Sequence, residues 1–214
     1  MEKYRKMEKQ SLLYFLSQIK DTRKDKGKRY PLPSLLCMLI IAQLNGCKAI
    51  KSAARFLKQH EDLFTDLFGL EHGVMACSQI NTVLKGLDFD SVNRAIWAWT
   101  TLHHPLDAVV ALSGDGKALR STVTDSQNNK QNYMSLVSFV DQASGLAYVC
   151  AKVEQKKKNE AEEIRKMILE FGITSTIIRL DSLHSQKKNI EIAEETNNIL
   201  FCQIKKTALY YINY

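Results

Sequence analysis

The sequence contains little proline and glycine and no long apolar run. Three prolines and nine glycines among 214 residues are too few for a low-complexity or disordered chain. The longest apolar run, residues 35–44, is interrupted by Gln43 and is about half as long as a membrane-spanning helix requires. The N-terminal segment MEKYRKMEKQ lacks the apolar core of a secretory signal. These absences predict a folded, cytoplasmic chain with no membrane partner.

Cysteine patterns that bind metals are also absent. The five cysteines are widely and irregularly spaced, without a C-x-x-C pair and without a histidine at zinc-ligand spacing. We therefore expect them to be reduced, mostly buried, and without a catalytic or metal-binding role. They are Cys37, Cys47, Cys77, Cys150 and Cys202.

The positive charge is concentrated in the first half of the chain. The whole chain carries 30 Lys and Arg against 23 Asp and Glu, a net charge of +7. Up to His104 the count is 16 against 10, and beyond it 14 against 13. A basic half beside a nearly neutral half favours a polyanion-binding part joined to a part with another task, because Lys and Arg displace counterions from phosphates.

Residues 1–104 have the spacing and punctuation of an all-helical domain. The segment from Ser34 to Asn45 is apolar nearly all round, as a central buried helix would be. Pro31 and Pro33 predict an extended chain just before this helix, and Gly46 predicts its end. Further helices are predicted at 8–19, 49–59, 61–68, 77–86 and 90–102.

From residue 105 the pattern becomes that of a mixed sheet. Short apolar runs bounded by turn residues predict strands, and an Asp141–Gly145 turn joins two of them as a hairpin. The order is β-β-β-α-β-α-β, whose strand-helix-strand units imply parallel, right-handed crossovers. Strands are predicted at 108–113, 133–140, 146–153, 175–180 and 198–204, and helices at 159–171 and 184–196. The fold class is therefore α+β or α/β, with a helical domain (1–104) followed by a sheet domain (105–214).

Two aspartates, Asp115 and Asp181, each follow an apolar strand directly. If the two strands are adjacent, the carboxylates converge, and such a pair can hold Mg²⁺ or Mn²⁺ for in-line phosphoryl transfer. The alternative is that an aspartate after a strand is ordinary turn chemistry. Because two aspartates occur within this strand order, the metal-site hypothesis has the same weight as the turn interpretation.

At this point the sequence resembles a family, the bacterial insertion-sequence transposases of the ISAs1 (H-repeat-associated) type. The segments that carry the resemblance are SGDGKALR at 113–120, Tyr133 to Phe139, Lys158-Asn-Glu160, Ile177 to Asp181 followed by Ser185-Gln186-Lys187, and upstream Asp21-x-Arg23, Gly27 to Leu36 and Ala53-x-x-Phe56. Together they cover nearly the whole chain.

The resemblance implies a D-D-E transposase whose catalytic domain is an incomplete RNase H-like sheet. It makes Asp115 and Asp181 the first and second catalytic acids and metal ligands, and it makes Lys117 and Arg120 contacts to DNA phosphates. It implies Mg²⁺ or Mn²⁺ as cofactor, DNA as partner, a nucleoid location when DNA is bound, and a possible homo-oligomer.

A D-D-E triad also needs a third acid, a glutamate on a later helix, and the resemblance assigns no residue of this sequence to that role. Glu191, Glu194 and Glu195 lie on the helix that follows the second aspartate directly, which is the wrong element. We therefore expect a truncated or frameshifted copy that is inactive alone. Two alternatives stay open: a non-catalytic DNA-binding remnant, and an RNase H-like nuclease that uses only the residues present.

Two features of the first half bear on DNA binding. The segment from Lys20 to Arg29 carries six Lys and Arg against two Asp, which indicates either a solvated loop or a phosphate contact. Its candidate DNA-binding residues are Lys24, Lys26, Lys28 and Arg29. Residues 77–86 have the place of a second helix in a helix-turn-helix, yet Lys85 is their only basic side chain, which favours core packing.

Overall fold

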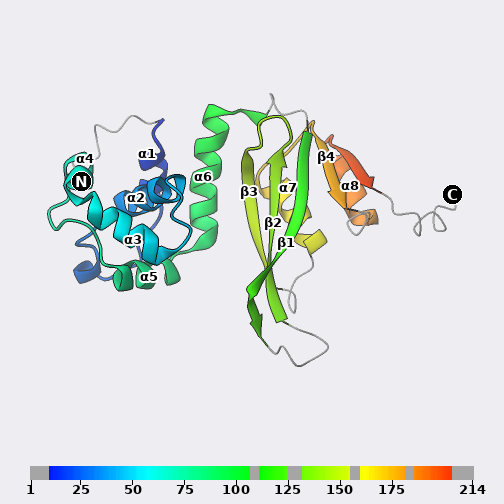
Figure 1. The fold of residues 1–214 in the computed structure, drawn as a ribbon. Helices are drawn as coiled ribbons and strands as arrows, with labels where there is room; N and C mark the ends of the chain where they lie inside the picture. Colours follow the sequence, from blue (N-terminus) through cyan, green and yellow to red (C-terminus); the bar gives the residue numbers. More distant parts are fainter. Residues whose placement is uncertain (1–9, 107–110, 125–131, 155–159, 182–185, 204–214) are drawn as a thin grey trace, which may run out of the picture. The chain divides into compact units, whose positions relative to one another are not determined.

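The computed structural model describes residues 10–106, 111–124, 132–154, 160–181 and 186–203. The chain divides into two compact units, Met1–Leu102 and His103–Tyr214. Each unit has its own secondary-structure class, helical in the first and a sheet with helices in the second (Figure 1). The fold is therefore α+β, as the sequence predicts. No helix in the described ranges is long and apolar enough to cross a membrane.

The first unit is helical throughout its described part. Every helix predicted from the sequence is present, within a few residues of its predicted ends, although residues 8 and 9 of the first predicted helix lie outside the described part. The elements are α1 (Leu12–Ser17), η2 (Asp25–Gly27, a 3-10 turn), α2 (Leu32–Leu44), α3 (Ile50–Gln59), α4 (Glu61–Phe68), α5 (Cys77–Lys85) and α6 (Phe89–His103).

The start of α2 differs from the prediction. We expected an extended chain up to Ser34, but the helix begins at Leu32 and includes Pro33 in its first turn. A proline is tolerated there because the first backbone N–H groups of a helix have no intrahelical partner. At the other end, Gly46 has φ +84°, so the helix ends where the sequence predicts.

Helix α2 is the centre of the first unit, buried on two sides. One side, with Leu35 and Met38, packs against α3, α4 and α5. The other side, with Leu36 and Cys37, packs against α1 and α6. Burial on both sides explains why its sequence is apolar nearly all round.

The second unit is a five-stranded mixed sheet in the order β3-β2-β1-β4-β5. The first three strands form an antiparallel meander, and β1, β4 and β5 are parallel. This order agrees with the RNase H-like sheet that the family resemblance implies. The elements are β1 (Ala111–Thr124), β2 (Asn132–Asp141), β3 (Ala147–Glu154), α7 (Glu160–Glu170), β4 (Ile177–Asp181), α8 (Lys187–Glu195) and β5 (Ile199–Gln203).

Helix α7 covers one face of this sheet, as Figure 1 shows. Its apolar stripe, which includes Ile164 and Ile168, is buried, and it contacts β2 and β3. The alternate residues of the strands on that face, such as Val137 and Phe139, are also buried. The opposite face at β4 and β5 is more open, and Phe201 on β5 is 59% exposed. At β4 and β5 the sheet therefore has one covered face and one accessible face.

The first strand is longer than the sequence predicts. We expected it to end at Ser113 and to present Asp115 in the following turn. In the structure β1 runs from Ala111 to Thr124, because β2 supplies antiparallel backbone partners, among them Ser138 opposite Asp115. Of the predicted strand 108–113, residues 108–110 lie outside the described part.

The cysteines are free thiols, as expected. Only Cys37 is buried, and the other four are half-buried, so the expectation that most would be buried is wrong. Burial raises the pKa of the Cys37 thiol to about 11, which keeps it protonated near neutral pH.

Candidate functional site

Asp115 and Asp181 lie on neighbouring parallel strands at the same level of the sheet. Strands β1 and β4 are paired with Ser113 opposite Arg179. Each aspartate follows its member of this pair by two residues, so both side chains project from the same face. Both are exposed. The two strands are adjacent, which is the condition that the sequence analysis set for the two aspartates to converge.

Glycines on either side of Asp115 keep its strand close to its neighbours. A Cβ atom at Gly114 would lie 2.5 Å from Leu180 Cδ2 and 2.8 Å from Phe139 Cε1. A Cβ atom at Gly116 would lie 2.7 Å from Glu160 Oε2. The alternating glycines thus let β4, β2 and the start of α7 pack directly against the backbone of β1.

The chemistry of this pair suits a hard divalent cation. Carboxylate oxygens are the ligands that Mg²⁺ and Mn²⁺ prefer, and exposure leaves room for water to complete the coordination. Among the described residues, no group of three or more His, Cys, Asp or Glu side chains is placed to hold a metal ion. The glutamates of α8, Glu191, Glu194 and Glu195, are exposed. The described residues therefore supply two carboxylates at this level of the sheet, the ligand type that such an ion takes.

The two basic residues of the D-G-K-x-L-R segment both lie on β1. Lys117 is exposed and follows Asp115 by two residues, so it shares the face of the aspartate pair. Its ammonium group is thus available to an anion near that pair. Arg120 lies further along the strand, and its side chain is outside the described part.

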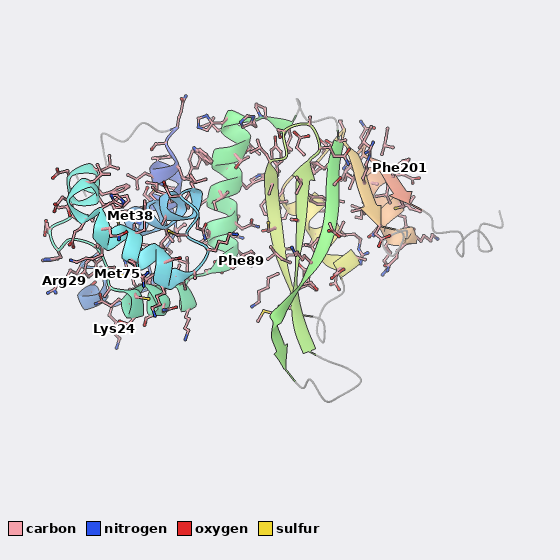
Figure 2. The ribbon with its side chains drawn as sticks, in the orientation of Figure 1. Lys24, Arg29, Met38, Met75, Phe89 and Phe201 are labelled. Carbon is pink, nitrogen blue, oxygen red and sulfur yellow. The ribbon has the colours of Figure 1, made fainter. Side chains whose placement is uncertain are left out.

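The predicted DNA-binding residues of the first unit surround η2. Lys24 and Arg29 are exposed, and Figure 2 shows both reaching outward from this segment. Lys28 is exposed and its Nζ lies 3.1 Å from Asp25 Oδ1. The side chain of Lys26 lies outside the described part. Among the described lysines of this group, Lys28 is the one held by an ion pair.

Arg23 lies in the same loop and is not among the residues that the sequence predicts to contact DNA. Its Nε and Nη2 donate to the carboxylate of Asp21 at 2.9 and 2.7 Å, and Nη2 also donates to the carbonyl of Tyr30 at 2.8 Å. The Arg23 guanidinium lowers the pKa of Asp21. The D-x-R spacing is the sequence feature that indicates this pair.

Comparison with known proteins relates the chain to transposases. Residues 13–100, which lie in the helical unit, match the family described as DDE_Tnp_1-associated. The chain is also 20% identical over 178 residues to "Putative transposase YncI" of Escherichia coli O157:H7, an alignment that covers 83% of this chain and 45% of that protein. The chain thus spans about half the length of this curated relative.

Among solved structures, the chain is similar to a piggyBac transposase in a synaptic complex with hairpin DNA. The TM-score is 0.40 at 12% identity, over 92% of this chain and 48% of that one. The family match and the curated relative thus point to the same group of proteins as the sequence motifs do.

Proposed function

We propose that this chain contributes the helical domain and the first part of the catalytic domain of an insertion-sequence transposase of the ISAs1 type. Its substrate is DNA, cut and joined at the ends of the element. Residues 1–104 form the DNA-binding part and residues 105–214 the catalytic part. The proposal is supported by the match of residues 13–100 and by the motifs around the two aspartates.

The observation that carries the proposal is the in-register aspartate pair on β1 and β4. A single aspartate at a strand end is ordinary turn chemistry. Two such aspartates on one face of adjacent parallel strands need a further reason, and a shared divalent cation supplies one, because carboxylate oxygens are its preferred ligands. A role of the two aspartates in binding a metal ion is therefore the simpler explanation of this arrangement.

In this proposal Asp115 and Asp181 hold Mg²⁺ or Mn²⁺. A divalent ion bound there would activate the attacking water or 3′-hydroxyl and stabilise the leaving oxygen of the phosphodiester. Lys117, on the same face, would bind a non-bridging phosphate oxygen and orient the scissile bond, and Arg120 would bind a neighbouring phosphate. A subunit partner of the same kind would bring the two DNA ends together.

Two carboxylates are too few to fix two ions in the geometry of strand transfer. We therefore expect the 214-residue chain to bind a divalent ion and DNA but not to join DNA ends by itself. Cleavage and joining of its own element's ends by the purified chain, lost in Asp115→Ala and Asp181→Ala, would show that the two aspartates suffice.

Metal binding tests the site directly. Mn²⁺ is titrated into the protein and the free ion is followed by electron paramagnetic resonance, for the wild type and for Asp115→Asn and Asp181→Asn. Each variant should bind Mn²⁺ at least about tenfold more weakly, because substitution of even a residue that only hydrogen-bonds to a metal ligand can cause a loss of that size. Glu194→Gln, which removes an exposed acid of α8 in the same unit, is the matched control and should bind as the wild type does. Equal binding by all four proteins would rule out the site.

A further inference from the structure

The first unit contains a pocket between the basic loop and helix α5. Its volume is about 540 Å³, which lies in the range of ligand-binding pockets. One wall is formed by the loop residues Arg23, Lys24 and Arg29. None of the residues that line the pocket is acidic. The pocket is thus a cationic concavity.

Arg23 presents a donor that the protein leaves without an acceptor. Its side chain is 15% exposed, and Asp21 and the Tyr30 carbonyl engage Nε and Nη2. Its Nη1 is buried and has no hydrogen-bond partner. A buried donor of a charged group that lacks an acceptor is costly, so such groups are rare unless a ligand or a water completes them. Asp21 holds the guanidinium in place in the wall of the pocket that Arg23 lines.

Helix α5 forms the opposite wall with its polar face. Ile80 is fully buried in the core of the unit, so the expectation that this helix packs into the core holds for one face. Ser78 and Thr82, which are exposed and four residues apart, line the pocket together with Gln79. The helix therefore places short polar side chains across from the arginines, and the sequence-based expectation missed this second face.

We propose that this pocket binds a backbone phosphate of duplex DNA, with Lys24 and Arg29 as its exposed cations and the Asp21-held guanidinium of Arg23 as a fixed positive charge in its wall. The proposal rests on the proposed function for the choice of DNA, and it adds Arg23 and α5 to the expected contacts. Arginine suits the role because its planar fork binds Asp21 with two nitrogens and so holds the positive charge in a fixed place.

The charge around the pocket favours a polyanion over a small anion. The loop from Lys20 to Arg29 carries six basic residues against two acidic ones, and Asp21 and Asp25 each pair within it. Exposed cations outside the pocket would contact the phosphates that flank the one inside, which a free phosphate ion does not offer. The polar face of α5 would then lie against the sugar and phosphate groups beside it.

Fluorescence anisotropy of a labelled duplex of about 20 base pairs tests the proposal, with the full chain in EDTA and salt raised from about 50 mM. Lys24→Gln, Arg29→Gln and Thr82→Glu should each weaken binding by about three- to tenfold for any sequence, and each lysine or arginine variant should reduce the salt slope by about 0.9. Lys51→Gln, an exposed lysine of α3 that does not line the pocket, is the charge-matched control and should change binding less.

Arg23→Lys tests whether DNA binding needs the planar guanidinium group of Arg23 or only its positive charge. It keeps the cation but removes Nη1, and should weaken binding by about tenfold. Its melting temperature is measured alongside, because loss of the Asp21 pair can loosen the loop. The three exposed variants do not depend on that pair, so they test the pocket even if Arg23→Lys unfolds.

The outcomes separate this proposal from the catalytic one. Glu194→Gln, which lies in the sheet unit outside both the pocket and the aspartate pair, should bind the duplex as the wild type does in EDTA. Wild-type binding that none of the pocket variants weakens more than Lys51→Gln overturns the pocket and leaves the metal site standing. Tighter binding of duplex RNA, or complete competition by inorganic phosphate at constant ionic strength, overturns the choice of DNA. Absence of duplex binding at low salt overturns both the pocket and the DNA-binding part of the proposed function.

Discussion

Substitution of Gly114 by alanine should destabilise the sheet unit and identify the packing that places Asp115. A Cβ atom at this position would lie 2.5 Å from Leu180 Cδ2 and 2.8 Å from Phe139 Cε1, whereas ordinary carbon contacts lie at 3.4–4 Å. Leu180 is 5% exposed and Phe139 is fully buried, so neither side chain can move into solvent. Overpacking of this kind costs about 1–3 kcal/mol.

The net effect is smaller than the clash alone. Alanine restricts the unfolded chain more than glycine does, which offsets about 0.4–1 kcal/mol. We therefore expect Gly114→Ala to lower the free energy of unfolding by about 1–2 kcal/mol, and the melting temperature of a unit of this size by about 4–8 °C per kcal/mol. Urea and thermal unfolding, followed by circular dichroism, measure both quantities.

Two further variants test the reasoning. Gly116→Ala should cost less, because the atoms that its Cβ would meet belong to the end of the Glu160 side chain, which is half-buried. Leu180→Ala removes the Cδ2 atom, so Gly114→Ala should cost less in that background than in the wild type. Wild-type stability of Gly114→Ala, or strictly additive effects of the two substitutions, would refute the packing argument.

Three other predictions concern the second unit. Asn198→Ala should cost about 1–3 kcal/mol in urea unfolding, because the 7%-exposed amide accepts from Thr176 N at 2.9 Å, and an unchanged midpoint would count against this. The pKa of Asp141 is lowered in the folded state, first by the hydrogen bond from the Ser144 hydroxyl and then by backbone N–H groups. The Asp141 carboxylate therefore stabilises the fold above about pH 4, and this stabilisation is lost as the pH falls through the lowered pKa of the folded state. The stability gap between the wild type and Asp141→Asn should therefore shrink on acidification, and a gap that stays constant to about pH 2 would contradict the assignment. Phe201→Gln should reduce self-association in sedimentation velocity runs, because that ring is 59% exposed; identical sedimentation at every concentration would contradict a role of Phe201 in self-association.

Most elements of the fold follow from local sequence patterns. The apolar spacing within α7 predicts a helix, and the glycine after it predicts where that helix ends. Gly172 has φ +60°, the left-handed conformation that such a helix end requires. The hairpin between β2 and β3 follows in the same way from the Asp141–Gly145 turn, where the Asp141 carboxylate accepts from the Ser144 amide at 2.9 Å. Such features depend on neighbours within a few residues, which is why the sequence predicts them.

The two candidate sites could be predicted from the sequence to different degrees. The motif around Asp115 and the run before Asp181 pointed to both aspartates, and their roles stay predictions. Arg23 was missed because an arginine in a charged loop has no local mark of burial. Its fixed geometry comes from Asp21 and from a carbonyl seven residues away.

The sequence by itself determined the element types, their faces and the concentration of positive charge in the first half, because these depend on residue spacing and composition. The tertiary structure alone decided that β1 extends to Thr124, since only β2 supplies the backbone partners for that length. It also decided that β4 lies beside β1, which brings Asp115 and Asp181 to one level, and that α5 faces the basic loop. Strand order and helix packing depend on contacts between residues far apart in the chain, and such contacts leave no periodicity within any single segment.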